Sequence, residues 1–303
     1  MRVVNLSVSD SIIRQIQSLS SQQSQLQSEV SSGLRLTQPS DDAAAFGRVM
    51  NLDSASRALS QYASNANTAL AISQATLTGL QQIKAVSDRA TQIGVLGTGT
   101  EGAQAMAAYG SEVDQLIQQV VQLGNSQLNN NYLYGGTATD TPPYTVATNA
   151  QGQITGVTYV GNSNQAAIPL SSTTTLAAGT DGATNQGIAD FLNHLVALRD
   201  ALNNGDTSAV ATAQNGLLST ENTLVDAIAG QGAVQMRIQV NQAQQTANTT
   251  SIGQLLSNET NADLPTTVVQ LTQAQNSYQA ALSTSAKIMQ TSLLNYLALP
   301  TTS

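Results

Sequence analysis

The sequence predicts a mainly α-helical protein whose two chain ends build a long helical bundle or coiled-coil shaft, with a small β-rich domain inserted between them. Three observations favour this fold class. Apolar residues follow a heptad spacing at both ends, helical spacing continues along most of the interior, and one neutral segment in the middle is rich in glycine, threonine and proline.

Apolar residues line one side of each predicted terminal helix. Alternating steps of four and three residues gather them into a narrow seam, which is typical of helices that pack against partner helices. Burial of so narrow a seam does not offset the entropy lost by ordering an isolated helix, so we expect both ends to order mainly against neighbouring copies. The predicted assembly interface consists of Ile12, Ile16, Leu19, Leu26, Val30, Leu264, Val268, Leu271, Tyr278, Leu282, Met289, Leu293 and Tyr296.

A turn separates the first two predicted helices. Glycine takes the left-handed conformation that ends a helix, proline keeps the residue before it extended, and small polar or acidic side chains cap the next helix. We expect Ser40 to Asp42 to supply one cap oxygen and two first-turn carboxylates. The residues of this predicted turn and cap are Gly33, Pro39, Ser40, Asp41 and Asp42.

Apolar spacing and capping residues locate the helices along the chain. A glycine-rich break at residues 94–102 interrupts them once, and the β-prone middle interrupts them again. The predicted helices cover residues 9–32, 41–93, 103–130, 188–202, 207–259 and 264–297.

Short β-prone runs occur at residues 144–146, 157–160 and 167–170, with a hairpin turn expected at 149–152. Before them, Gly135, Gly136, Pro142 and Pro143 are flanked by Tyr132, Tyr134 and Tyr144. This strip is either a simple domain corner or a fixed elbow that holds the insert against the shaft, and we favour the elbow. The predicted domains are 1–40 with 260–303 (terminal helices), 41–136 with 187–259 (shaft) and 137–186 (β insert).

Only 9% of the 303 residues are charged and 3% are aromatic. An ordinary soluble protein has about 25% charged residues, and surfaces with so few charges can pack against copies of themselves at a small desolvation cost. The net charge of −8 and the total of 10 Lys and Arg argue against a nucleic-acid partner, because phosphate neutralisation requires clustered basic residues. Self-association is the expected mode of interaction.

The chain contains no cysteine, which removes disulfides, thiolate metal sites and cysteine nucleophiles. No stretch approaches the run of about 18 apolar residues that a membrane helix needs, so we expect no membrane insertion. The first ten residues contain no continuous apolar run, so we expect no cleaved signal peptide.

Residues 97–102 have the spacing of a dinucleotide-binding G-x-G-x-x-G motif. That motif requires a preceding strand and an acidic residue about 20 positions later, whereas helical spacing precedes this segment and no suitable acid follows it. We interpret the segment as a hinge between helices.

Other candidate chemistry has a simpler explanation. Asp41 and Asp42 could form a carboxylate pair, but neighbouring helical residues point about 100° apart and capping explains both. His194 is the only histidine, and a triad needs a located nucleophile and acid, so we favour a surface or packing role. The glycosylation pattern at Asn248 is short and frequent by chance. We predict no catalytic, cofactor-binding or metal-binding residue, and no enzyme.

Three segments carry a resemblance to a known family. Residues 31–44, Ser-Ser-Gly-Leu-Arg-Leu-Thr-Gln-Pro-Ser-Asp-Asp-Ala-Ala, resemble the N-terminal signature of the bacterial flagellin family. The Pro-Ser pair within them is more similar to the hook-associated members of that family than to flagellin itself. Residues 130–144 and 271–297 are similar to the helix exit and the terminal helix of the same members, while the tail at 298–303 extends past their usual ending.

The resemblance implies a secreted, non-enzymatic axial protein of the bacterial flagellum, at the junction between hook and filament. It implies export through the flagellar type III apparatus, with an export chaperone on the C-terminal helix. The implied partners are copies of itself in a ring or helical lattice, the first hook–filament junction protein, and flagellin. The terminal helices would form the inner wall of the tube, the long helices its outer shaft, and the β domain would face solvent.

Two other functions stay open. The chain could be the flagellin filament subunit itself, which a high copy number per filament would indicate. A secreted adhesin-like or translocator binding protein could also have helical ends and a β insert. That function predicts ligand binding by residues 137–186 alone and ordered termini in the monomer.

Overall fold

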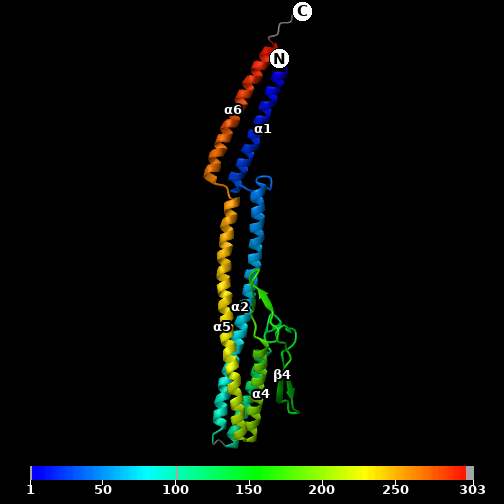
Figure 1. Ribbon diagram of the computed structural model, residues 1–303, viewed down its shortest axis with the longest axis vertical. Helices are drawn as coiled ribbons and strands as arrows, with labels where there is room; N and C mark the ends of the chain where they lie inside the picture. Colours follow the sequence, from blue (N-terminus) through cyan, green and yellow to red (C-terminus); the bar gives the residue numbers. More distant parts are fainter. Residues whose placement is uncertain (1, 100–101, 298–303) are drawn as a thin grey trace, which may run out of the picture. The chain divides into compact units, whose positions relative to one another are not determined.

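The computed structural model describes residues 2–99 and 102–297, with side chains described for residues 10–99 and 102–290. Its helices and strands follow one another as shown in Figure 1, and the predicted α-helical fold with a small β insert is confirmed. The helices are α1 (Arg2–Ser32), α2 (Ala43–Gly97), α3 (Ala103–Gly124), α4 (Gly182–Asn204), α5 (Thr207–Thr260) and α6 (Leu264–Leu297). The strands are β1 (Gln127–Leu128), β2 (Asn131–Tyr132), β3 (Tyr144–Thr148), β4 (Ile154–Tyr159), β5 (Ala167–Pro169) and β6 (Thr175–Ala177).

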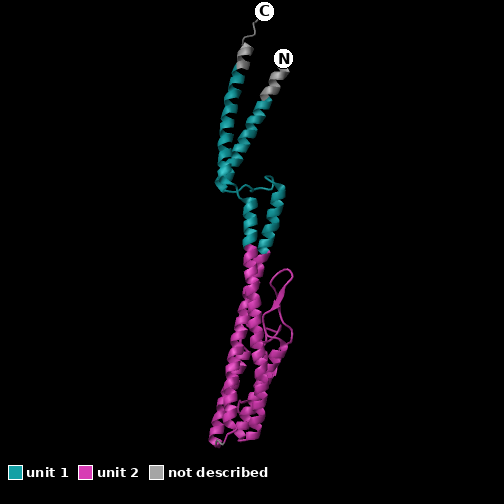
Figure 2. Ribbon diagram, turned by 60° about the vertical axis from the view of Figure 1, so that its left-hand side comes forward, with its two compact units in different colours: residues 1–57, 250–303 teal, residues 58–249 magenta. Residues whose placement is uncertain are grey.

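The chain divides into two compact units, which Figure 2 distinguishes by colour. Unit 1 contains residues 1–57 and 250–303, and unit 2 contains residues 58–249. Both boundaries fall inside long helices, α2 and α5, so each of these helices contributes to both units. The predicted division into three domains, with boundaries near residues 40, 136, 187 and 259, stays a prediction about the assembled protein.

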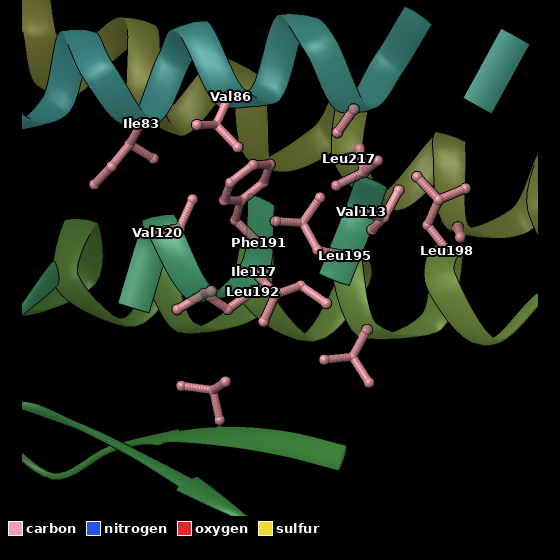
Figure 3. Packing of buried hydrophobic residues seen from close by; sticks show 14 of the residues in the cluster. Ile83, Val86, Val113, Ile117, Val120, Phe191, Leu192, Leu195, Leu198 and Leu217 are labelled. Carbon is pink, nitrogen blue, oxygen red and sulfur yellow. The ribbon is translucent and has the colours of Figure 1, made fainter. Parts of the chain in front are cut away.

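Four helical segments of unit 2, from α2, α3, α4 and α5, enclose its main hydrophobic core. Each helix presents an apolar stripe with helical spacing, and the stripes meet at α4. Figure 3 shows the packing of Ile83, Val86, Val113, Ile117, Val120, Phe191, Leu192, Leu195, Leu198 and Leu217. This core gives the β insert a rigid base.

Side chains of α4 bind the β3–β4 hairpin by forming hydrogen bonds with backbone groups of β4, as a neighbouring strand would. The amide of Asn193 donates to the carbonyl of Val157 (2.9 Å) and accepts from its N–H (2.9 Å). The buried guanidinium of Arg199 donates to the carbonyl of Ile154 (2.7 Å) and to Asp114 of α3 (3.1 Å). A two-stranded hairpin is marginally stable alone, and these bonds attach it to the bundle.

The β5–β6 hairpin lies over α2 and α5 on a second, smaller core. Leu170, Leu176 and Ala178 pack there against Ala66 and Ala69 of α2 and Ile238 of α5. Amide side chains hold the hairpin at two consecutive carbonyls: Asn65 donates to Pro169 (2.9 Å) and Gln245 to Leu170 (2.8 Å). The alanines leave space for the hairpin close to the helix backbone.

Several predicted boundaries were wrong. Helix α2 continues to Gly97 rather than ending at residue 93, because the N–H of Thr98 still donates to the carbonyl of Gly94 (3.1 Å), so the break predicted at residues 94–102 begins inside the helix. Helix α1 begins at Arg2 rather than at residue 9, because Ser9 and Asp10 lie inside a continuing helix. Helix α3 ends at Gly124 rather than near residue 130, because Asn129 (φ 52°) and Asn130 (φ 65°) form the left-handed turn between β1 and β2. Helix α4 begins at Gly182, six residues before the expected position, because Asp181 accepts a hydrogen bond from the N–H of Thr184 (2.8 Å).

Candidate assembly interface

Helix α1 packs against α6 in an antiparallel pair within unit 1 (Figure 1). The predicted N-terminal seam forms its contact side, while most of its other described positions are exposed. Leu26 is the most buried of these residues, with 7% of its surface exposed. The buried or half-buried residues along this side are Ile12, Ile16, Leu19, Gln23, Leu26 and Val30.

The contact side of α6 differs from the predicted C-terminal interface. Its buried or half-buried positions follow a heptad spacing, with Gln275 beside the row, and most of them are small or polar: Thr267, Leu271, Ala274, Gln275, Tyr278, Ala281 and Ser285. Only Leu271 and Tyr278 belong to both the predicted interface and this contact side. Small side chains allow α1 and α6 to approach closely, so the intramolecular pair does not use all the apolar residues of α6.

The remaining apolar residues of the predicted seam form an exposed row on α6. This row, called the α6 flank below, is at least 44% exposed at every position and consists of Leu264, Val268, Leu282 and Met289. A heptad row of uncovered branched and thioether side chains is an apolar surface suited to a further helix. The predicted residues Leu293 and Tyr296 lie in α6, but their side chains fall outside the described residues.

The two connectors at the base of this helix pair bind each other. Leu34 and Asn261 form an antiparallel β-bridge, the N–H of Arg35 donates to the carbonyl of Thr260 (2.8 Å), and that of Ala262 to Gly33 (2.9 Å). We call residues 33–36 and 260–262 the terminal joint. Gly33 has φ +72°, the left-handed conformation predicted for it.

An ion pair between α2 and α5 supports the terminal joint. Arg48 donates to both carboxylate oxygens of Glu259, at 2.8 Å each, and Arg35 donates to the Glu259 carbonyl (3.0 Å). The hydrogen bond from Arg48 lowers the pKa of Glu259. Sequence reasoning missed this pair, because 211 positions separate its members and no local pattern connects them.

Asp41 and Asp42 have separate structural functions. Asp42 is the N-cap of α2, since it accepts from the N–H groups of Ala44 (3.0 Å) and Ala45 (2.9 Å). Asp41 belongs to the preceding turn, where it accepts from the N–H groups of Thr37 (3.0 Å) and Gln38 (2.8 Å). These bonds lower the pKa of each carboxyl. The cap oxygen thus comes from Asp42 and not from Ser40, and Asp41 is not in the first turn of the helix.

Two buried tyrosines hold the segment that leads into the β insert. The Tyr134 hydroxyl donates to the Thr76 carbonyl on α2 (3.0 Å), and the Tyr144 hydroxyl to the Asn185 carbonyl on α4 (2.8 Å). Burial raises the pKa of both phenols, so both remain protonated donors.

The glycines of the predicted elbow also have close neighbours. A Cβ on Gly135 would overlap the Ala138 carbonyl oxygen, and Gly136 has φ +69°. Pro142 and Pro143 follow in the connection to β3, and the Pro143 carbonyl accepts from the N–H of Val160 (2.8 Å). These contacts are the geometry on which the elbow interpretation rests.

The other candidate motifs have no arrangement for chemistry. The segment 97–102 begins at the last residue of helix α2 rather than after a strand, and its residues 100–101 lie outside the described part. His194 packs closely against Gly216, where a Cβ would overlap the imidazole ring. Among the described residues, no group of three His, Cys, Asp or Glu could hold a metal ion, and no helix has the length and apolarity of a membrane span.

Comparisons with known proteins place this fold. Residues 3–139 match the bacterial flagellin N-terminal helical region. No curated protein matches the chain at the level of sequence.

Several solved structures share the fold. A structure described as a flagellar hook-associated protein from Vibrio parahaemolyticus has a TM-score of 0.65 and 18% identity, covering 73% of this chain and 100% of its own. FlgL from Bacillus cereus has a TM-score of 0.58 and 17% identity, and the match covers 68% of this chain and 98% of FlgL. FlgL from Xanthomonas campestris has a TM-score of 0.55 and 14% identity, and the match covers 68% of this chain and 99% of FlgL.

The superpositions include nearly the full length of each of these structures and about seven tenths of this chain. The sequence match lies in the N-terminal half and includes the predicted signature at residues 31–44. Residues 3–139 are thus similar to the bacterial flagellin N-terminal helical region, and the chain has the fold of these flagellar hook-associated protein structures.

Proposed function

We propose that this protein is a structural, non-enzymatic subunit of the bacterial flagellum that links the hook to the flagellin filament. The observation that carries the proposal is the combination, in one chain, of a flagellin-type N-terminal helical region with the fold of hook-associated proteins. The low charge of the chain supports the same role, because it reduces the desolvation cost of packing identical subunits together.

Assembly would use the paired terminal helices. In this proposal the seam of α1 fastens α6 within one subunit, and the α6 flank contacts a neighbour. The flank is suited to this because Leu264, Val268 and Leu282 are exposed while small residues make the contact with α1. Leu293 and Tyr296 would extend the same interface toward the chain end. Burial of each large apolar side chain of the flank is worth about 1.5–3 kcal/mol.

The neighbours would be of three kinds. Copies of the chain would surround each subunit in a ring or helical lattice, the first hook–filament junction protein would lie on one side, and flagellin on the other. The terminal helices would line the tube and the β insert would lie outside. No nucleic acid or membrane insertion takes part in this assembly.

The location would be extracellular, in the flagellum, after passage through the flagellar type III apparatus without cleavage of a signal peptide. A chaperone on α6 would keep the α6 flank from associating before export. Exposed apolar helices of this kind associate readily, which gives the chaperone a physical reason to bind there.

Electron microscopy of cells that lack the protein tests the proposal. We expect hooks without filaments, with flagellin released into the medium. Immunogold labelling of wild-type cells should place the protein at the hook–filament boundary alone. Labelling along the whole filament would instead identify a filament subunit, and normal filaments in the deletion strain would contradict both functions.

Deletion of residues 264–303 isolates the contribution of α6. The shortened protein should be made, yet the cells should lack filaments, because the α6 flank is gone. Normal motility of this strain would overturn the assembly role assigned to α6.

A further inference from the structure

A cavity of about 500 Å³, partly open to solvent, lies at the surface of unit 2, away from the terminal helices. Helix α2 forms one wall, the β1–β2 hairpin forms another, and the segment that contains β5 and leads toward α4 forms the third. Sites for small molecules have volumes of about 300–1,000 Å³. The cavity is therefore large enough for one or two sugar rings.

None of the residues that line the cavity carries a charge. A charged ligand would lose its hydration without gaining a counter-charge, so the lining favours a neutral ligand. Without a carboxylate in the lining, the cavity also lacks the acid pair that glycoside hydrolysis requires. The site is suited to binding and not to cleavage.

Several lining side chains have hydrogen-bonding capacity that the described part of the chain leaves unused. The Tyr132 hydroxyl and the Asn129 side-chain amide form no hydrogen bond with other described residues, and Asn67 uses its amide oxygen only, accepting from Gln242 (2.8 Å). These groups include both donors and acceptors. A ligand that both donates and accepts, as a hydroxyl does, fits this set best.

Two backbone N–H groups of the cavity wall, at the end of β2, are already hydrogen-bonded. The N–H of Tyr132 donates to the carbonyl of Thr139 (3.0 Å), and the N–H of Leu133 donates to Ser126 (3.1 Å). A peptide that added a strand at β2 would need these groups. These two groups are not free to bind a ligand, which disfavours an extended peptide added at β2.

Apolar surface completes the cavity. Ile72 of α2 and Ile168 of β5 are half-buried and lie in its walls together with Tyr132. A pyranose ring has apolar C–H faces and a rim of hydroxyls, so it matches a cavity with an aromatic ring, aliphatic walls and neutral polar groups. We propose that this cavity binds a neutral saccharide unit, with Tyr132, Asn67 and Asn129 as its hydrogen-bonding residues.

Titration of the full-length protein tests the proposal, with binding followed by saturation-transfer-difference NMR. The probes are glucose, N-acetylglucosamine and maltose, with glucuronic acid and a neutral Gly-Ser-Gly amide as comparison compounds. We expect at least one neutral sugar to bind with a millimolar Kd. The variant Tyr132→Phe should weaken binding about 2- to 10-fold, which is the effect of losing one hydrogen bond. The fold should stay intact, because the hydroxyl has no partner within the described part of the chain.

A matched pair of variants locates the binding site. Ala71 is an exposed position of α2 that lines the cavity, and Ala58 is an exposed position of the same helix outside it. The variant Ala71→Phe should abolish sugar binding by filling the cavity, while Ala58→Phe should bind like the wild type.

Three results would overturn the proposal. The first is that no neutral sugar binds at about 50 mM, an order of magnitude above the expected Kd. The second is that Ala71→Phe leaves sugar binding unchanged. The third is that the peptide or glucuronic acid binds more strongly than every neutral sugar.

Discussion

Arg48 on α2 forms a two-pronged ion pair with Glu259 on α5, with both N–O distances at 2.8 Å. Bidentate pairing fixes the orientation of both side chains as well as their separation. Glu259 also presents its backbone carbonyl to Arg35, at 3.0 Å, next to the hydrogen bonds of the terminal joint. The pair therefore connects the long helices to the point where the chain enters α1 and α6.

Loss of this ion pair should loosen the terminal joint. In Glu259→Gln the charge is gone and Arg48 keeps at most one good acceptor, so the N–H groups of Arg35 and Ala262 should exchange with solvent several-fold faster. Hydrogen-exchange mass spectrometry measures this. The control is Asp226→Asn, which neutralises an exposed acidic residue on the same helix. Equal exchange in both variants would show that the ion pair does not hold the joint.

The terminal joint should also weaken in acid. Asp41, Asp42 and Glu259 have lowered pKa values in the folded protein, mainly through hydrogen bonds from backbone N–H groups or from Arg48. A lowered folded-state pKa gives stability that is present above the unfolded pKa and lost as the pH falls through the folded one. The protection factor of the joint amides, which is the intrinsic exchange rate divided by the observed rate at the same pH, should be constant near neutral pH and fall below about pH 4.

Double substitution of Asp41 and Asp42 by asparagine provides the control for this pH dependence. Asparagine keeps cap acceptors but does not titrate in this range. The acid-induced loss of protection should be smaller in the double variant. A loss of the same size would assign the effect to other groups.

Burial distinguishes two functions among the apolar residues of the terminal helices. Leu26 is 7% exposed and packs between α1 and α6, whereas Leu282 is 44% exposed on the α6 flank. The variant Leu282→Asp should leave the helical content of the monomer unchanged but abolish assembly, and Leu282→Met should assemble normally. The variant Leu26→Asp should weaken the helix pair that forms on assembly and, because that pair is not stable in the monomer, should also leave the circular dichroism of the monomer nearly unchanged. Sedimentation measures assembly and circular dichroism measures the helical content of the monomer; assembly of Leu282→Asp at the wild-type level would remove the flank from the interface.

Two glycines of α2 differ in what surrounds them. A Cβ on Gly79 would overlap the Tyr134 hydroxyl oxygen, whereas a Cβ on Gly47 would meet nothing within 4 Å. The variant Gly79→Ala should displace the hydroxyl from the Thr76 carbonyl and lower the free energy of unfolding by about 1–3 kcal/mol. Gly47→Ala should raise it by up to about 1 kcal/mol through helix propensity. Thermal unfolding measures both, and a stabilised Gly79→Ala would contradict the elbow contact.

Local patterns predicted most of the helices, because their signals lie within a few residues. Gly33 took its left-handed conformation, and the heptad row from Ile12 to Val30 lies on the contact side of α1. The intramolecular contact side of α6 was not visible in the hydrophobic pattern, and the predicted interface of α6 with neighbouring subunits stays a prediction. On α6, Ala274 and Ser285 are buried because small side chains permit close packing, while larger residues remain exposed.

Other features depend on tertiary contacts and had no local signal. The pairing of Arg48 with Glu259 spans 211 positions. Strand β6 is three residues long and is held by β5 rather than by its own propensity. The end of α3 could have been found, since Asn129 and Asn130 belong to the residue type that adopts left-handed turns most readily after glycine.

In the proposed assembly, α1 and α6 become stable only when neighbouring subunits cover the α6 flank. Hydrogen exchange of residues 10–32 and 264–290, compared between dilute monomer and polymerised protein, tests this dependence. We expect rapid exchange of these amides in the monomer and strong protection after polymerisation, with unit 2 protected in both. Full protection of both helices in a dilute, non-associating monomer would contradict the claim.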